Sequence, residues 1–245
     1  MKDMFKEFFI SLTLAHFVAD FVMQTDSLSR QKRERKATSW FMYVHAATVA
    51  LLSIIMVWDF RMWPIALIIG GSHLLIDLGK SFIAKESTFV FIADQILHII
   101  IILAMWQLCK SRLCWQVPVW LTQEVLKAEM VAIAVILCNK PSNILIKGIL
   151  ESHKVVPLKS GKEDLSEEKL LHAGKMIGTL ERWLILVFLL IGKYEVIGFL
   201  IAAKSIIRFG EQDKSRTEYF IAGTLLSIFM AIVIGFGTRW VLASC

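Results

Sequence analysis

The feature that most constrains this chain is a series of apolar segments, several of them long enough to cross a membrane as one helix. Hydrophobic residues make up 56% of the 245 residues, and the mean hydropathy is +0.63. About 20 apolar residues in a helix cross the hydrocarbon core of a bilayer, where the backbone must satisfy its hydrogen bonds internally. We therefore expect an all-α integral membrane helical bundle and not a soluble domain.

The lengths of the apolar segments predict about eight transmembrane spans. The expected spans are residues 5–24, 40–58, 62–83, 89–109, 119–138, 171–191, 194–209 and 218–242. The only long polar loop follows the fifth of them. It divides the chain into an N-terminal five-span part (1–150), a polar cytoplasmic loop (151–170) and a C-terminal three-span part (171–245). The first span lacks a small-residue cleavage site, so we expect it to be retained.

The segment between the first two expected spans carries the strongest signal for orientation. Basic residues accumulate in cytoplasmic loops, so this segment should be cytoplasmic and both chain termini should lie outside. The net charge is +6, and most of the basic residues lie in loops beside the spans, where membrane orientation and attraction to anionic lipid explain them. We therefore expect no nucleic-acid partner. The basic residues of this segment are Arg30, Lys32, Arg33, Arg35 and Lys36.

Four of the six histidines lie inside the apolar segments, accompanied by aspartates. Three His/Asp pairs have i, i+4 spacing, which places both side chains on one face of a helix. An ionisable group in the bilayer costs about 2.5–3.5 kcal/mol on insertion scales, so such groups normally face the bundle interior. We call this set the His/Asp cluster; its members are His16, Asp20, His45, His73, Asp77, Asp94 and His98.

The positions of these residues within their spans predict that they converge. Those in odd-numbered spans lie near the end of the span, and those in even-numbered spans lie near its start. Because consecutive spans run in opposite directions, all seven residues should occupy one leaflet, within roughly 6–15 Å of the helix ends at 1.5 Å per residue. The basic segment indicates the cytoplasmic leaflet.

The chemistry of the His/Asp cluster allows two interpretations. Neutral imidazole and carboxylate are ligands for Zn, Mn or Fe, so all seven residues are candidate ligands of a one- or two-metal site. Asp20, Asp77 and Asp94 are also candidates for a catalytic general base. The alternative is structural, with each pair neutralising itself and locking the bundle. The four cysteines form no C-x-x-C pair, and we expect none of them to bind metal.

Further polar residues accompany the cluster. In the C-terminal part, the basic residues Arg182, Lys204 and Arg208 are candidates for binding an anionic group, because the arginine fork matches phosphate oxygens. The alternative is that they extend to the membrane interface as ordinary anchors. The candidate supporting residues around the cluster and the basic residues are Gln24, Lys80, Gln95, Glu181 and Glu218.

Several motifs together resemble an uncharacterised family, a domain of unknown function found in bacterial multi-pass membrane proteins. They are H-x-x-A-D-F-x-x-Q-T (16–25), H-x-x-x-D-x-x-K (73–80) and D-Q-x-x-H (94–98), followed by G-K-x-I-G-x-L-E-R, A-K-S-I-x-R-F and E-Y-F-x-x-G-T. The resemblance covers residues 10–100 and 172–226. It implies a multi-pass protein of a bacterial cytoplasmic (inner) membrane. A looser similarity, in the intramembrane histidines and H-x-x-x-D alone, is to membrane-bound metal-dependent hydrolases.

We therefore expect a metal-dependent intramembrane hydrolase. It would act at the cytoplasmic leaflet on a lipid-linked or membrane-proximal phosphate or acyl ester, with divalent Zn, Mn or Fe. The alternatives are a proton-coupled or anion transporter and a non-enzymatic membrane scaffold. Buried His/Asp pairs can carry protons, but the sequence shows no internal repeat with broken helices in matching positions, which is typical of secondary transporters.

Overall fold

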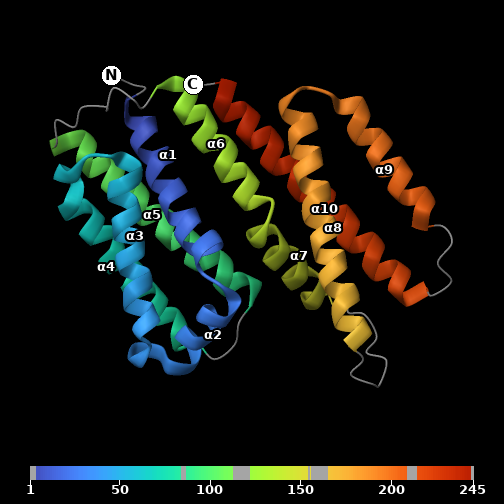
Figure 1. Ribbon diagram of the computed structural model, residues 1–245, viewed down its shortest axis with the longest axis horizontal. Helices are drawn as coiled ribbons and strands as arrows, with labels where there is room; N and C mark the ends of the chain where they lie inside the picture. The colour runs from blue at the N-terminus through green and yellow to red at the C-terminus, as the bar shows by residue number, and fades with distance from the viewer. Residues whose placement is uncertain are drawn as a thin grey trace. The chain divides into compact units, whose positions relative to one another are not determined.

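The computed structural model describes residues 4–83, 87–112, 122–153, 155, 165–208 and 214–243. All regular secondary structure in these ranges is helical (Figure 1), which confirms the predicted all-α class. The chain divides into two compact units, Met1–Ile136 and Leu137–Ser244. The predicted division at the polar loop 151–170 falls inside the second unit.

In the first unit, four helices enclose an apolar interior. Helix α1 packs against α3 and α5, and α4 packs against α3 and α5. Phe8, Val49, Ile69 and Ile102 are among the buried residues of this core. The helices of the unit are α1 (Met4–Phe17), α2 (Asp26–Arg35), α3 (Trp40–Val57), α4 (Trp63–Ser81), α5 (Thr88–Arg112) and α6 (Gln123–Leu137), joined by the short turns η1 (Val18–Met23), η2 (Lys36–Thr38) and η3 (Phe60–Met62).

The first expected span does not continue as a regular α-helix. From Val18 to Met23 the chain forms the π-helical turn η1, in which the Gln24 N–H bonds to the carbonyl of Ala19, five residues back. Helix α2 then follows at an angle of 92°. Its N-terminus is capped by Thr25, whose hydroxyl accepts a hydrogen bond from the Leu28 N–H. The basic segment predicted as a loop is therefore largely helical.

Helices α3 and α4 approach closely at a glycine. A Cβ atom added to Gly70 would lie 2.8 Å from the carbonyl oxygen of Ala46 and 2.9 Å from the Cβ of Ala50. Small residues at such positions let membrane helices approach closely. This contact lies three residues before His73 and next to His45, so it fixes the separation of the two helices where they carry imidazoles.

The second unit contains α7 (Lys140–Ser152), α8 (Leu165–Leu190), α9 (Tyr194–Arg208) and α10 (Lys214–Ala243). Helix α10 packs against α7 and α8, and α8 packs against α9. Ile185, Leu189, Ile197 and Ala231 form its apolar core. Arg182 is buried in this unit and joins α8 to residues of α7 and α10.

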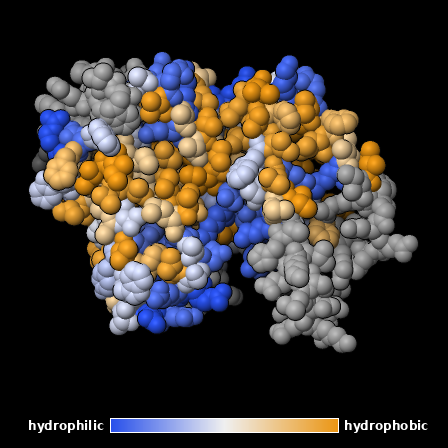
Figure 2. Space-filling view, viewed as in Figure 1, coloured by the Kyte–Doolittle hydropathy of each residue, from blue (hydrophilic) through white to orange (hydrophobic). Residues whose placement is uncertain are grey.

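Among the described residues, five helical segments are long and apolar enough to cross a membrane, or six when the bent pair Glu7–Met23 and Asp26–Thr38 is counted as one span. Many large apolar side chains on these segments are exposed, as the hydrophobic surface in Figure 2 shows. These features indicate a membrane protein. The expected spans 171–191 and 194–209 correspond to α8 and α9, which are not among the five. The five are Trp40–Val57, Phe60–Ser81, Thr88–Leu108, Gln123–Ser152 and Tyr219–Ala243.

Candidate functional site

The structure brings the whole His/Asp cluster together inside the first unit. Helix α1 supplies His16, the turn η1 supplies Asp20 and α3 supplies His45, while α4 and α5 each supply one His/Asp pair. The side chain of Asp20 is 11% exposed, and the other six residues are buried. Segments that are distant in sequence therefore direct their ionisable groups into one interior layer, as their spacing predicts.

Three ligand-type atoms form a nearly equilateral triangle at the centre of the cluster. Asp20 Oδ1 lies 3.2 Å from His45 Nε2 and 3.3 Å from His73 Nε2. The two imidazole nitrogens lie 3.0 Å from each other. We call these three atoms the central triangle; they come from η1, α3 and α4.

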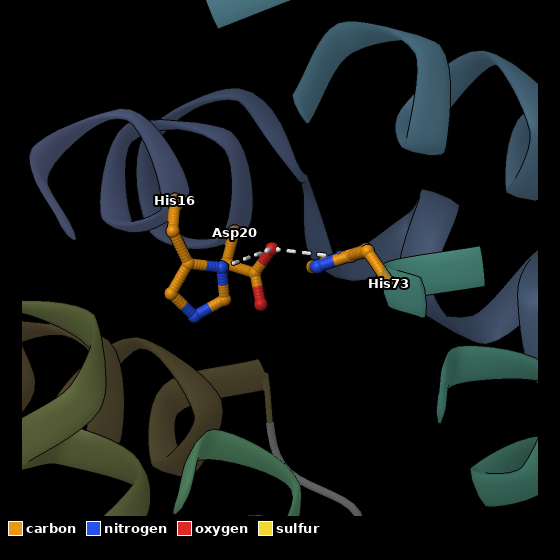
Figure 3. A group of neighbouring side chains, drawn as sticks. All are labelled: His16, Asp20 and His73. Carbon is orange, nitrogen blue, oxygen red and sulfur yellow. Dashed lines mark ion pairs between the residues drawn. The ribbon is translucent and has the colours of Figure 1, made fainter. Parts of the chain in front are cut away.

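His16 approaches the central triangle from the other side of Asp20. Figure 3 shows the carboxylate of Asp20 between His16 and His73, with both marked ion pairs ending on the same oxygen. His16 Nδ1 lies 3.8 Å from Asp20 Oδ1, which is too far for a hydrogen bond. The ring of His16 also lies beside that of His98, with 4.9 Å between their centroids.

Asp77 connects the central triangle to a lysine that sequence reasoning did not assign to the site. Asp77 Oδ2 lies 3.6 Å from His73 Nε2 and 3.9 Å from His45 Nε2. Lys32 Nζ donates to the same oxygen at 2.5 Å and to Gln24 Oε1 at 2.9 Å. Gln24, a candidate supporting residue, thus accepts a hydrogen bond from Lys32 through its side-chain oxygen.

Lys32 was missed because it lies in a segment whose charge is explained by membrane orientation. The structure buries it to 7% exposure, whereas Arg30 and Arg35 of the same helix are exposed. One sequence signal was available: Lys32 follows Leu28 by four residues, so on a helix it shares the face of the segment's one large apolar residue. That signal requires residues 26–35 to be read as a helix.

The third His/Asp pair, Asp94 and His98, lies beside α4 and is held by two further side chains. Lys80 Nζ donates to Asp94 Oδ2 at 2.7 Å. Gln95 Nε2 lies 3.1 Å from the same oxygen and 3.3 Å from Asp20 Oδ2. Gln95, a candidate supporting residue, thus donates to two acids of the cluster.

The balance of charge in the cluster favours an additional cation. Its three carboxylates face two ammonium groups, those of Lys32 and Lys80. With the four imidazoles neutral, one buried negative charge remains, and a buried charge is costly unless it is paired. A divalent metal or a protonated imidazole would compensate it.

The donor set and its spacing fit a divalent metal ion. The described residues contain three groups of possible ligands, and within each group the ligand atoms lie within 4.8 Å of one another. The groups are His16 with Asp20 and His73, His45 with His73 and Asp77, and Asp77 with Asp94 and His98. Nitrogen and carboxylate oxygen donors suit Zn, Mn or Fe. These residues are the ones that would hold the ion.

The predicted anion-binding residues lie in the second unit. Arg182 is 1% exposed and donates to the Cys138 carbonyl, Ser227, Asn143 and Thr179. All four of these partners are neutral.

Two further basic residues were predicted to bind the same anionic group. Lys204 is ion-paired with Glu181, one of the candidate supporting residues. The side chains of Arg208 and Glu218 lie outside the described residues.

A buried acid on α6 is a second feature that the sequence did not indicate. Ser11 of α1 donates to Glu129 Oε2 at 2.8 Å, and both residues are buried. Burial raises the cost of an ionised carboxylate, and this hydrogen bond ties α6 to α1 within the first unit.

Residues 8–126 match the model of a family described as "Protein of unknown function (DUF3307)". The N-terminal part of the chain is therefore similar to that family, which confirms the resemblance to an uncharacterised family for this part. The later segments of the resemblance, at residues 172–226, lie beyond the matched range. No curated protein and no solved structure matches the chain.

Proposed function

We propose that the His/Asp cluster binds a divalent metal ion and that the protein is a metal-dependent intramembrane hydrolase. The observation that carries the proposal is the central triangle of Asp20 Oδ1, His45 Nε2 and His73 Nε2, with sides of 3.0–3.3 Å. Tetrahedral ligand atoms about 2.0–2.1 Å from Zn lie roughly 3.3 Å apart. The three atoms are thus spaced like ligands of one ion.

Hydrogen bonding alone does not account for the central triangle. Each neutral imidazole carries a single N–H, and an ionised carboxylate oxygen can only accept. With a proton on both Nε2 atoms, each histidine can donate to Asp20, but the two N–H groups then oppose each other at 3.0 Å. With a proton on one of them, at least one contact joins two lone pairs. A cation between the three atoms makes all three contacts favourable, which supports the metal over a structural lock.

The chemistry of the proposed reaction is divided between the ion and the surrounding side chains. A divalent metal supplies a Lewis acid that activates water and stabilises negative charge on an ester oxygen. With a single ion held by the central triangle, Asp77 and Asp94 are the candidate general bases, since neither belongs to the triangle. Gln95 orients the carboxylates of Asp20 and Asp94 through its two contacts at 3.3 and 3.1 Å.

The surroundings support an anionic, membrane-associated substrate such as a lipid-linked or membrane-proximal phosphate or acyl ester. The cluster lies among helices of span length, and α2, which bends away from the first span, exposes basic side chains that attract anionic head groups. Binding of the anionic group by Arg182, Lys204 and Arg208 remains a prediction.

The proposed setting is the cytoplasmic (inner) membrane of a bacterium, with about eight spans, both termini outside and the cluster in the cytoplasmic leaflet. The five or six apolar helices support the membrane setting. The basic residues of α2 support the cytoplasmic position of the cluster end of these helices. Reporter fusions at Cys245 and within 151–169 test this topology; an external loop with a cytoplasmic C-terminus contradicts it.

Hydrolysis is tested with the detergent-purified protein and two probes, phosphatidic acid for phosphate release and p-nitrophenyl butyrate for acyl transfer to water. We expect metal-stimulated turnover of one probe that chelator abolishes and that is lost in His73→Ala. His153→Ala is the matched control, because His153 is an exposed histidine of the second unit. Turnover that is equal in the wild type and His73→Ala contradicts the proposal.

A further inference from the structure

We infer that the cluster holds a second divalent cation, bound by Asp77, Asp94 and His98, and that the substrate is a phosphate ester. The inference rests on the proposed function, since it adds a second position beside the central triangle. The ligand atoms of these three buried residues lie within 4.8 Å of one another. In the part of the chain that the structure describes, Asp77 contacts both imidazoles of the central triangle, whereas Asp94 and His98 form no hydrogen bond or ion pair with it.

Buried polar atoms that lack a hydrogen-bond partner concentrate at this position. Asp94 Oδ1 and His98 Nε2 are both such atoms, and so are Gln95 Oε1 and His16 Nε2 next to them. Asp94 is 5% exposed and His98 is 3% exposed. A buried polar atom without a partner is unfavourable and calls for a bound ion or water. Two of these atoms are of the types that bind divalent metals.

The geometry of Asp94 leaves one oxygen for an ion. Its Oδ2 atom is held by Lys80 at 2.7 Å and by Gln95 at 3.1 Å. Its Oδ1 atom lies 3.6 Å from His98 Nε2, which exceeds hydrogen-bond length but suits two ligands of one cation. Lys80 and Gln95 are therefore positioning residues that orient the carboxylate toward His98.

Asp77 links the two proposed positions. Its carboxylate belongs to the group with His45 and His73 and also to the group with Asp94 and His98. A carboxylate shared in this way is expected of a bridging ligand, and paired catalytic metals lie about 3.5–4 Å apart. One aspartate between two ligand sets is thus an arrangement that suits a two-metal centre.

The charge of the loaded site selects between the two ester classes. Two divalent cations together with Lys32 and Lys80 outweigh the three carboxylates, so the site would carry an excess of positive charge. Such a site favours a dianionic phosphate ester over a neutral acyl ester. Two metals also stabilise both the attacking and the leaving oxygen of an in-line displacement at phosphorus.

The test counts metal ions in the full-length protein after loading with Zn²⁺ and, in parallel, Mn²⁺. We expect two ions per chain in the wild type and an exchange-coupled Mn²⁺ spectrum in electron paramagnetic resonance. Asp94→Asn and His98→Ala should each retain one ion with an uncoupled spectrum. Asp59→Asn, which alters an aspartate outside the cluster, should behave as the wild type.

The possible failures are distinguishable. One ion in the wild type that is retained in Asp94→Asn and His98→Ala but lost in His45→Ala overturns the second position and leaves the proposed function standing. Two ions that persist in both variants also overturn it. No bound ion in the wild type overturns the second position and the proposed function together. Melting temperatures show whether Asp94→Asn or His98→Ala fails to fold. If one of them does, the metal content of the other tests the second position.

Discussion

His45 Nε2 and His73 Nε2 lie 3.0 Å apart although they belong to different helices, α3 and α4. Their proximity depends on the close approach of these helices at Gly70, where a Cβ atom would lie 2.8 Å from the Ala46 carbonyl oxygen. The geometry of the candidate metal site is therefore set by a residue that contributes no ligand.

Gly70→Ala should move α3 away from α4 and widen the gap between the two histidines. Overpacking of this kind costs about 1–3 kcal/mol, so we expect a lower melting temperature and weaker Zn²⁺ binding. Gly71→Ala is the matched control, because a Cβ atom there meets nothing within 4 Å. Equal melting temperatures and Zn²⁺ affinities in the two variants would show that the close contact does not set the site.

Lys32→Met should destabilise the metal-free protein, because it leaves the buried Asp77 carboxylate without its ammonium partner at 2.5 Å. Removing one member of a buried ion pair costs about 3–5 kcal/mol. Thermal unfolding in detergent measures the effect, with Arg30→Met on the exposed face of α2 as the control. A Lys32→Met protein as stable as the control would place Lys32 outside the site.

Asp77→Asn should likewise lower stability, since it leaves the Lys32 ammonium buried beside a neutral amide. A loss of metal in this variant could therefore come either from the missing ligand or from the lower stability of the fold. Variants of His45 and His73 separate ligation from folding more cleanly, because neither imidazole contacts a lysine through a hydrogen bond or ion pair in the described structure.

Arg182→Lys should destabilise the second unit and leave metal binding in the first unit unchanged. The guanidinium of Arg182 makes four hydrogen bonds to neutral acceptors, and the single ammonium of lysine cannot reproduce that fork. The measurement is thermal unfolding beside Zn²⁺ content, with the exposed Lys175→Met as the control. If Arg182→Lys has the same melting temperature as the control but no longer binds phosphatidic acid vesicles, the predicted anion-binding role is favoured instead.

The sequence predicted the helical class and the gathering of the seven cluster residues, because both follow from periodicity. Span-length apolar segments predict helices, and the i, i+4 spacing of His73 and Asp77 fixes their shared face. The alternating direction of successive spans then places the pairs at one depth.

Other parts of the site depend on tertiary contacts that periodicity does not report. The π-helical turn around Asp20 arises within a segment that reads as a continuous apolar helix. The burial of Lys32 requires the 92° bend before α2. The hydrogen bond between Ser11 and Glu129 joins residues that are 118 positions apart, and no local pattern relates them.

The central claim, that the three atoms of the central triangle bind a divalent metal, is tested most directly by the metal content of the purified wild type beside His73→Ala, measured by elemental mass spectrometry. The account predicts stoichiometric Zn, Mn or Fe in the wild type, unchanged in His153→Ala and lost in a folded His73→Ala. The claim is contradicted if the wild-type protein contains no metal and takes up none from added Zn²⁺, Mn²⁺ or Fe²⁺. The His/Asp pairs would then have the structural role of neutralising one another and holding the helices together.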